Sequence, residues 1–76
     1  MTFKELLHEI RTLKGGAFPD TAVREFPIVI SERVQQEILT SGKSIEETAD
    51  IFMDAIEEVN RGSRSKLETL IEKRLR

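Results

Sequence analysis

The apolar positions of this chain recur mainly at steps of three and four residues, which is the spacing of one face of a helix. The broadest apolar stripe lies in residues 44–60, and Ile51, Met53 and Ala55 widen it. Its members are Ile45, Ala49, Phe52, Ile56 and Val59. Because an apolar arc of roughly 200° can contact neighbours on two sides, we expect this helix to form the centre of the fold.

The same spacing predicts three other helices, each beginning at a capping residue. The first begins at Thr2, which forms a capping box with Glu5, and it ends at Gly15-Gly16. It buries one face, formed by Phe3, Leu6, Leu7, Ile10 and Leu13. The second follows Ser31 and spans residues 32–40. Serine–glutamate capping boxes predict the starts of the central helix, at Ser44 with Glu47, and of the last helix, at Ser65 with Glu68.

Residues 17–30 contain both prolines of the chain and show the weakest helical pattern. Ile28-Val29-Ile30 follows Pro27 and could form at best an edge strand, so we expect an extended segment laid across the helices. Its apolar side chains, Phe18, Val23, Phe26 and Ile28, are expected to plug the core. The fold prediction is therefore one all-α domain, residues 1–76, of four helices with an extended, proline-containing connector between helices 1 and 2.

Length and composition exclude several classes of protein. A chain of 76 residues buries only about 60% of its unfolded surface, so its core is small or is completed by a partner. There is no cysteine, which excludes disulfides and thiolate metal sites. The longest apolar runs have three residues, far fewer than the ~20 of a membrane span. We expect no membrane association, no cofactor, a cytoplasmic location and an origin in a bacterium, phage or mobile element.

Charge is distributed unevenly although the net charge is only −2. Residues 26–60 carry two bases against eight acids, whereas residues 61–76 carry six bases against two acids. The central helix thus has a narrow face of six carboxylates with no cation among them: Glu46, Glu47, Asp50, Asp54, Glu57 and Glu58. Such a face is either simply solvated or docks on a basic surface, belonging to a partner or to this chain's own tail. A straight helix spreads its carboxylates apart, which disfavours divalent-metal binding.

Two other possible sites carry little chemistry. His8 is the only histidine, and it lies on the polar side of its helix without a nucleophile or an orienting carboxylate beside it. Gly42-Lys43-Ser44 matches the end of a phosphate-binding P-loop, but Glu37 stands where that loop needs its first glycine. A helix stop followed by a helix cap explains this segment better.

Two stretches resemble DNA-binding folds. Residues 28–59, a possible strand followed by a short helix, a glycine turn and a longer helix, resemble a ribbon-helix-helix repressor. Residues 38–52 resemble the first two helices of a helix-turn-helix domain. Either resemblance implies a transcriptional regulator, with the basic tail as its nucleic-acid contact.

The sequence therefore favours a non-enzymatic binding or regulatory module over a nucleic-acid-binding regulator. The apolar arc of residues 44–60 is wider than one neighbour covers, so either the other helices or a second copy covers the surplus, and we favour a symmetric homodimer. The predicted contacts to a basic protein partner are Glu46, Asp50, Asp54, Glu57 and Glu58. The alternative contacts to nucleic acid are Arg61, Arg64, Lys66, Lys73 and Arg74.

Overall fold

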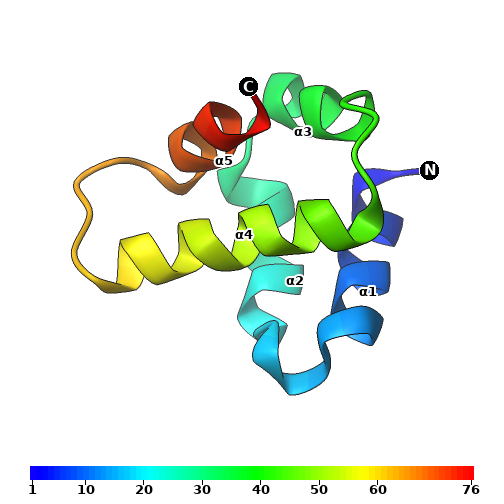
Figure 1. The fold of residues 1–76 in the computed structure, drawn as a ribbon, viewed down its shortest axis with the longest axis horizontal. Helices are drawn as coiled ribbons and strands as arrows, with labels where there is room; N and C mark the ends of the chain where they lie inside the picture. The colour runs from blue at the N-terminus through cyan, green and yellow to red at the C-terminus, as the bar shows by residue number, and fades with distance from the viewer.

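The chain consists of five α-helices and one short 3-10 turn in the computed structural model, which describes residues 1–76 (Figure 1). The elements are α1 (Phe3–Lys14), η1 (Gly15–Ala17), α2 (Asp20–Val29), α3 (Glu32–Leu39), α4 (Ile45–Asn60) and α5 (Leu67–Leu75). The all-α prediction is confirmed, whereas the predicted number of four helices is wrong. No helix combines the length and the hydrophobicity that crossing a bilayer requires.

Helix α4 lies at the centre, as its broad apolar arc predicts. In Figure 1 it crosses the molecule between α1 and α2 on one side and α3 and α5 on the other, and it packs directly against α1 and α5. Its buried side chains are Thr48, Ala49, Phe52 and Ala55. The Thr48 hydroxyl donates to the backbone oxygen of Ser44 at 2.9 Å, so this buried polar group is satisfied.

The extended connector predicted between helices 1 and 2 is instead helix α2. Pro19 is its N-cap, a position that needs no backbone N–H, and Pro27 lies in the last turn. A proline there removes one intrahelical hydrogen bond but leaves the preceding two turns intact. The helix buries Ala22 and Phe26 on its inner face, and this burial outweighs the local proline signal.

The predicted plugs of this segment divide between core and surface. Phe18 and Phe26 are buried and Val23 is partly buried, as expected, but Ile28 is 82% exposed. Ile30 takes its place in the core. The reason is the helical conformation, which turns Ile28 to the outer face of α2 and leaves no strand at 28–30.

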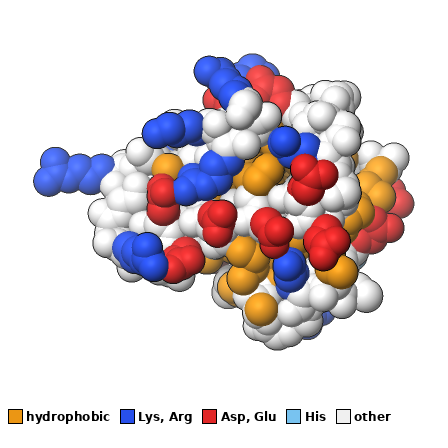
Figure 2. All heavy atoms as spheres, viewed as in Figure 1, with side chains coloured by type: hydrophobic (Ala, Val, Ile, Leu, Met, Phe, Trp, Pro, Cys, Tyr) orange, Lys and Arg blue, Asp and Glu red, His pale blue; other side chains and the backbone are white.

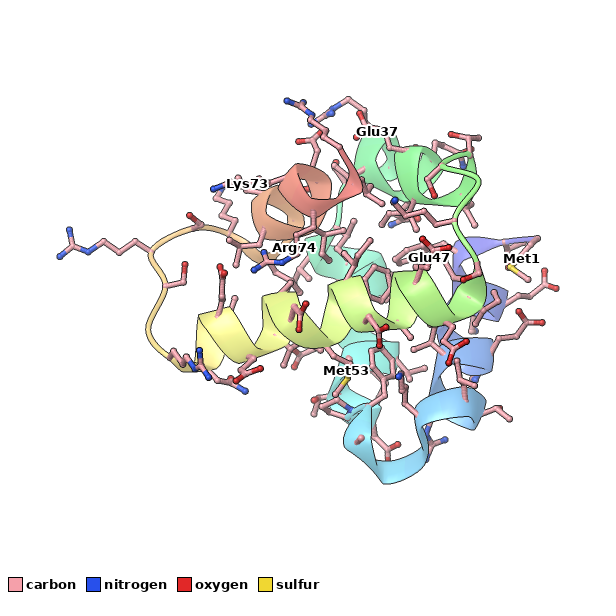
Figure 3. All side chains as sticks on the ribbon, in the orientation of Figure 1. Met1, Glu37, Glu47, Met53, Lys73 and Arg74 are labelled. Atoms are coloured by element: carbon pink, nitrogen blue, oxygen red, sulfur yellow. The ribbon has the colours of Figure 1, made fainter.

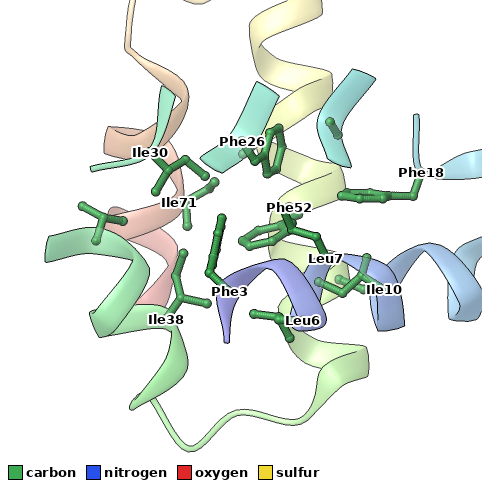
Figure 4. Packing of buried hydrophobic residues seen from close by; sticks show 14 of the residues in the cluster. Phe3, Leu6, Leu7, Ile10, Phe18, Phe26, Ile30, Ile38, Phe52 and Ile71 are labelled. Carbon is green, nitrogen blue, oxygen red and sulfur yellow. The ribbon is translucent and has the colours of Figure 1, made fainter. Parts of the chain in front are cut away.

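Four phenylalanines form the middle of the core, around Phe52 of α4 (Figure 4). The ring of Phe52 lies 6.3 Å from that of Phe3, 6.4 Å from that of Phe18 and 5.3 Å from that of Phe26, measured between centroids. Aromatic pairs at these separations are attractive beyond their buried area. One side chain thus joins α1, the η1–α2 corner and α2 to the central helix.

Two carboxylates of α5 contact α3, and one of them belongs to the capping box predicted at Ser65, which does not form. Helix α5 begins at Leu67 after Lys66, with no side-chain cap from Ser65. The Glu68 carboxylate accepts a hydrogen bond from the backbone N–H of Ser31 at 2.9 Å, and Glu72 accepts one from Arg33 at 2.6 Å. Glu68 therefore serves the N-terminus of α3 rather than that of its own helix.

These contacts make the attachment of α5 sensitive to acid. The hydrogen bond from the Ser31 backbone lowers the pKa of Glu68, and the hydrogen bond from Arg33 lowers the pKa of Glu72. A carboxyl with a lower pKa in the folded state stabilises the fold above its unfolded pKa of about 4.3, and that stability is lost as the pH falls through the folded value.

We therefore expect the melting temperature to fall as the pH drops below about 4.3, and Glu68→Gln to make this acid dependence shallower. Some dependence remains in the variant because Glu72, and Glu5 with its Thr2 cap, also have lowered pKa values. Thermal melts followed by circular dichroism at a series of pH values measure the effect. Identical acid dependence in the wild type and Glu68→Gln would contradict the role of the Glu68–Ser31 contact.

Candidate protein-binding surface

The predicted acidic face is present on the outward side of α4. Figure 2 shows a row of acidic side chains along this helix, on the face turned to the viewer. Glu46, Glu47, Asp50, Asp54 and Glu57 are exposed and Glu58 is half-buried. The row forms because these positions lie opposite the buried residues at helical spacing. The helix thus exposes carboxylates over its whole length.

Three cations pair with this face, two from other helices and one from the residue that follows α4. The Lys14 ammonium of α1 lies 3.0 Å from a carboxylate oxygen of Asp50. Arg61, just beyond α4, pairs with Glu57. Arg74 of α5 pairs with Glu58, and Figure 3 shows its side chain directed from α5 toward α4. The chain's own basic tail therefore occupies the C-terminal half of the acidic face.

The carboxylates of α4 differ in how far other groups compensate their negative charge. Glu47 accepts hydrogen bonds from the N–H and hydroxyl of Ser44 in the capping box, which is confirmed. Glu46 and Asp54 form no ion pair. Asp50 keeps 65% of its side chain exposed despite its contact with Lys14. The uncompensated charge is therefore concentrated in the first and middle turns of α4.

A shallow apolar hollow adjoins the first turn of α4. It lies between the end of α1 and the start of α4, and its lining residues are Glu9, Thr12, Leu13, Ser44, Ile45 and Glu46. Leu13 was expected in the core but is 50% exposed, because it follows the last buried turn of α1. No sequence pattern indicates this hollow, since its two walls are more than 30 residues apart. The arrangement combines an apolar floor with two carboxylates at its rim.

The basic residues of the C-terminal segment are divided between two roles. Arg61 and Arg74 are engaged with the acidic face. Arg64, Lys66 and Lys73 are exposed and form no ion pair. In Figure 3 the labelled Lys73 points away from α4, unlike Arg74. The five residues therefore do not form one continuous cationic surface.

Neither DNA-binding resemblance survives in the arrangement of the elements. The ribbon-helix-helix fold needs a strand at 28–30, where this chain completes α2 and enters the turn before α3. In the helix-turn-helix comparison, α4 would be the second helix, but it continues for 16 residues and exposes carboxylates. A surface rich in carboxylates repels the phosphate backbone.

The remaining polar sites offer no assembled chemistry. His8 and Arg11 line a surface hollow beside η1, in which Arg11 pairs with Asp20. Lys43 lies in the turn between α3 and α4, and Ser44 is the N-cap of α4, as the helix-stop interpretation predicts. No group of three histidine, aspartate or glutamate side chains is placed to hold a metal ion.

No protein-family model matches the chain, and no curated or structurally solved protein is similar enough to count as a match. The geometry of the surface and the charges on it therefore carry the functional argument.

Proposed function

We propose that this protein is a non-enzymatic binding module that docks a partner protein through the acidic face of α4. The observation that carries the proposal is the pair of exposed carboxylates, Glu46 and Asp54, that no cation of the chain neutralises. Like charges spaced along one helix face destabilise the helix slightly, and a basic partner would relieve that repulsion.

The hollow beside Glu46 defines the chemistry of the partner further. Lysine and arginine carry an apolar stem below a charged head, so one such side chain can cover Leu13 and Ile45 while its head meets Glu9 or Glu46. A partner segment that alternates basic and apolar residues therefore fits this surface better than a purely cationic one. Its cations would compete with Arg61 and Arg74 for Glu57 and Glu58.

Selection from a random peptide display library tests the proposal without a known partner. We expect the selected peptides to be enriched in Lys and Arg interleaved with apolar residues. Glu46→Lys and Asp54→Lys should each weaken binding of these peptides about tenfold, because reversal replaces an attraction by a repulsion. Binding should also weaken with salt, since the Debye length falls from about 10 Å at 0.1 M to about 3 Å at 1 M.

The matched control is Glu32→Lys. It changes the net charge by the same amount and also lies in the first turn of a helix, but on α3 and without an ion pair. We expect this variant to bind the selected peptides as the wild type does. Peptides without positive charge, or equal binding by all three lysine variants, would contradict docking on the acidic face.

The second candidate is nucleic-acid binding by the C-terminal segment, which the unpaired Arg64, Lys66 and Lys73 favour. Electrophoretic mobility shift with random duplex DNA over a salt series distinguishes it from the first. This candidate requires a salt-sensitive shift that Arg64→Ala and Lys66→Ala abolish and that Asp54→Lys does not. The absence of any shift at low salt would exclude it.

A further inference from the structure

The outer face of α2 exposes an apolar end that the chain itself leaves uncovered. Ile28 is 82% exposed, the largest fraction among the large hydrophobic side chains, and its neighbour Val29 is 50% exposed. Pro27 is exposed as well. Removing an isoleucine or valine side chain from water is favourable, so covering this end of the helix stabilises the covered state.

The same face carries two charges that find no partner within the chain. Arg24 and Glu25 are exposed and neither forms an ion pair. At helical spacing, Thr21 and Ile28 lie on one line along α2, with Arg24 on one side of it and Glu25 on the other. The face thus has an apolar residue on its central line and opposite charges on its two flanks.

We propose that this face binds a second copy of the chain, with the two α2 helices side by side and parallel about a two-fold axis that runs along them. In that arrangement residues on the central line meet their own copies, so Ile28 packs on Ile28. Residues on opposite flanks meet each other, so Arg24 of each copy faces Glu25 of the other, twice by symmetry. The apolar ends of both helices then lie together.

The charges select the parallel arrangement over the antiparallel one. An antiparallel pair brings residues of the same flank together, so Arg24 would face Arg24 and Glu25 would face Glu25. It would also place Ile28 against the polar start of the partner helix, at Thr21. Like charges directly opposite each other are destabilising, so the face complements itself only when the helices are parallel.

This interface is separate from the surface of the proposed function and from the arc that made a dimer plausible on sequence grounds. The apolar arc of α4 is largely covered by α1, α2 and α5 within one chain, so it provides no argument for a second copy. Helix α2 has only ten residues, so a contact through its outer face alone buries less surface than a standard interface of about 1,200–2,000 Å². The dimer is therefore weak, with a dissociation constant on the order of 100 µM.

Sedimentation equilibrium from about 10 µM to about 1 mM tests the proposal. The wild type should rise from 8.7 kDa toward twice that mass, and Ile28→Glu should stay at 8.7 kDa throughout. Because Ile28 is exposed, the change should leave the helical circular dichroism spectrum intact. Leu13→Glu is the control: it adds the same charge at an exposed apolar position on α1 and should dimerise as the wild type does. A monomeric wild type, or an Ile28→Glu variant that still dimerises, would overturn the proposal.

A charge exchange tests the parallel geometry. Arg24→Glu and Glu25→Arg should each weaken dimerisation several-fold, and the double variant should restore it, because the exchanged charges again face each other across the axis. Failure of the double variant to recover would overturn the assigned pairing. Ile28→Glu should not change binding of the basic peptides, whereas Asp54→Lys should weaken that binding and leave dimerisation unchanged, so the two proposals fail independently.

Discussion

Phe52→Ala is expected to lower the free energy of unfolding by about 3–5 kcal/mol. The side chain is fully buried, and its ring packs against those of Phe3, Phe18 and Phe26. Truncation leaves a cavity where four elements meet, so the neighbours cannot close it by moving one helix. For 76 residues the whole stability is about 4–11 kcal/mol, so the variant should be close to unfolding at room temperature.

Urea denaturation followed by circular dichroism measures this loss. Phe52→Leu is the matched control, since it keeps most of the apolar volume and should cost clearly less than the alanine substitution. If Phe52→Ala cost less than about 1 kcal/mol, the aromatic cluster would not be the centre of the core. Such a result would also remove the packing reason for the helical connector α2.

Ile71→Ala is expected to cost about 2–5 kcal/mol, which makes α5 an integral part of the fold rather than an appended tail. Ile71 is completely buried in the core, and its neighbour Leu70 is also buried. The polar contacts of Glu68 and Glu72 with α3 lie at the solvent edge, where they position α5 more than they stabilise it. Burial of Ile71 is therefore the main attachment of this helix.

The control for this prediction is Leu75→Ala in the same helix. Leu75 is only partly buried at the end of α5, so its truncation should cost less than that of Ile71. Equal costs for the two variants, or a melting temperature unchanged by Ile71→Ala, would show that α5 is not anchored through Ile71. Denaturation curves of both variants under one set of conditions decide the question.

The features predicted correctly are those whose interactions are local in the sequence. The capping boxes at Thr2 and Ser44 join residues three apart, and both are present. The third, at Ser65, has the same sequence pattern but does not form, since Glu68 finds Ser31 across 37 positions. A capping pattern says which side chains can cap, and a competing donor brought in by the fold determines which contact forms.

The acidic face of α4 also has one feature that local sequence predicts and one that it does not. Its position on α4 follows from helical spacing alone. Its effective charge does not, because Lys14 and Arg74 come from other helices and neutralise Asp50 and Glu58. The hollow formed by Leu13 and Ile45 is likewise absent from any local pattern, since its walls come from two helices.

The all-α class, the central place of α4 and the row of carboxylates on its outer face can be predicted from the residues alone, because each depends on the periodicity of one helix and its own caps. The helical conformation of residues 20–29 follows only from packing between helices, since burial of Ala22 and Phe26 outweighs two prolines. Packing also determines which carboxylates keep their charge and that Ile28 faces solvent. These outcomes depend on contacts between residues far apart in the chain, and such contacts leave no periodic signal in the sequence.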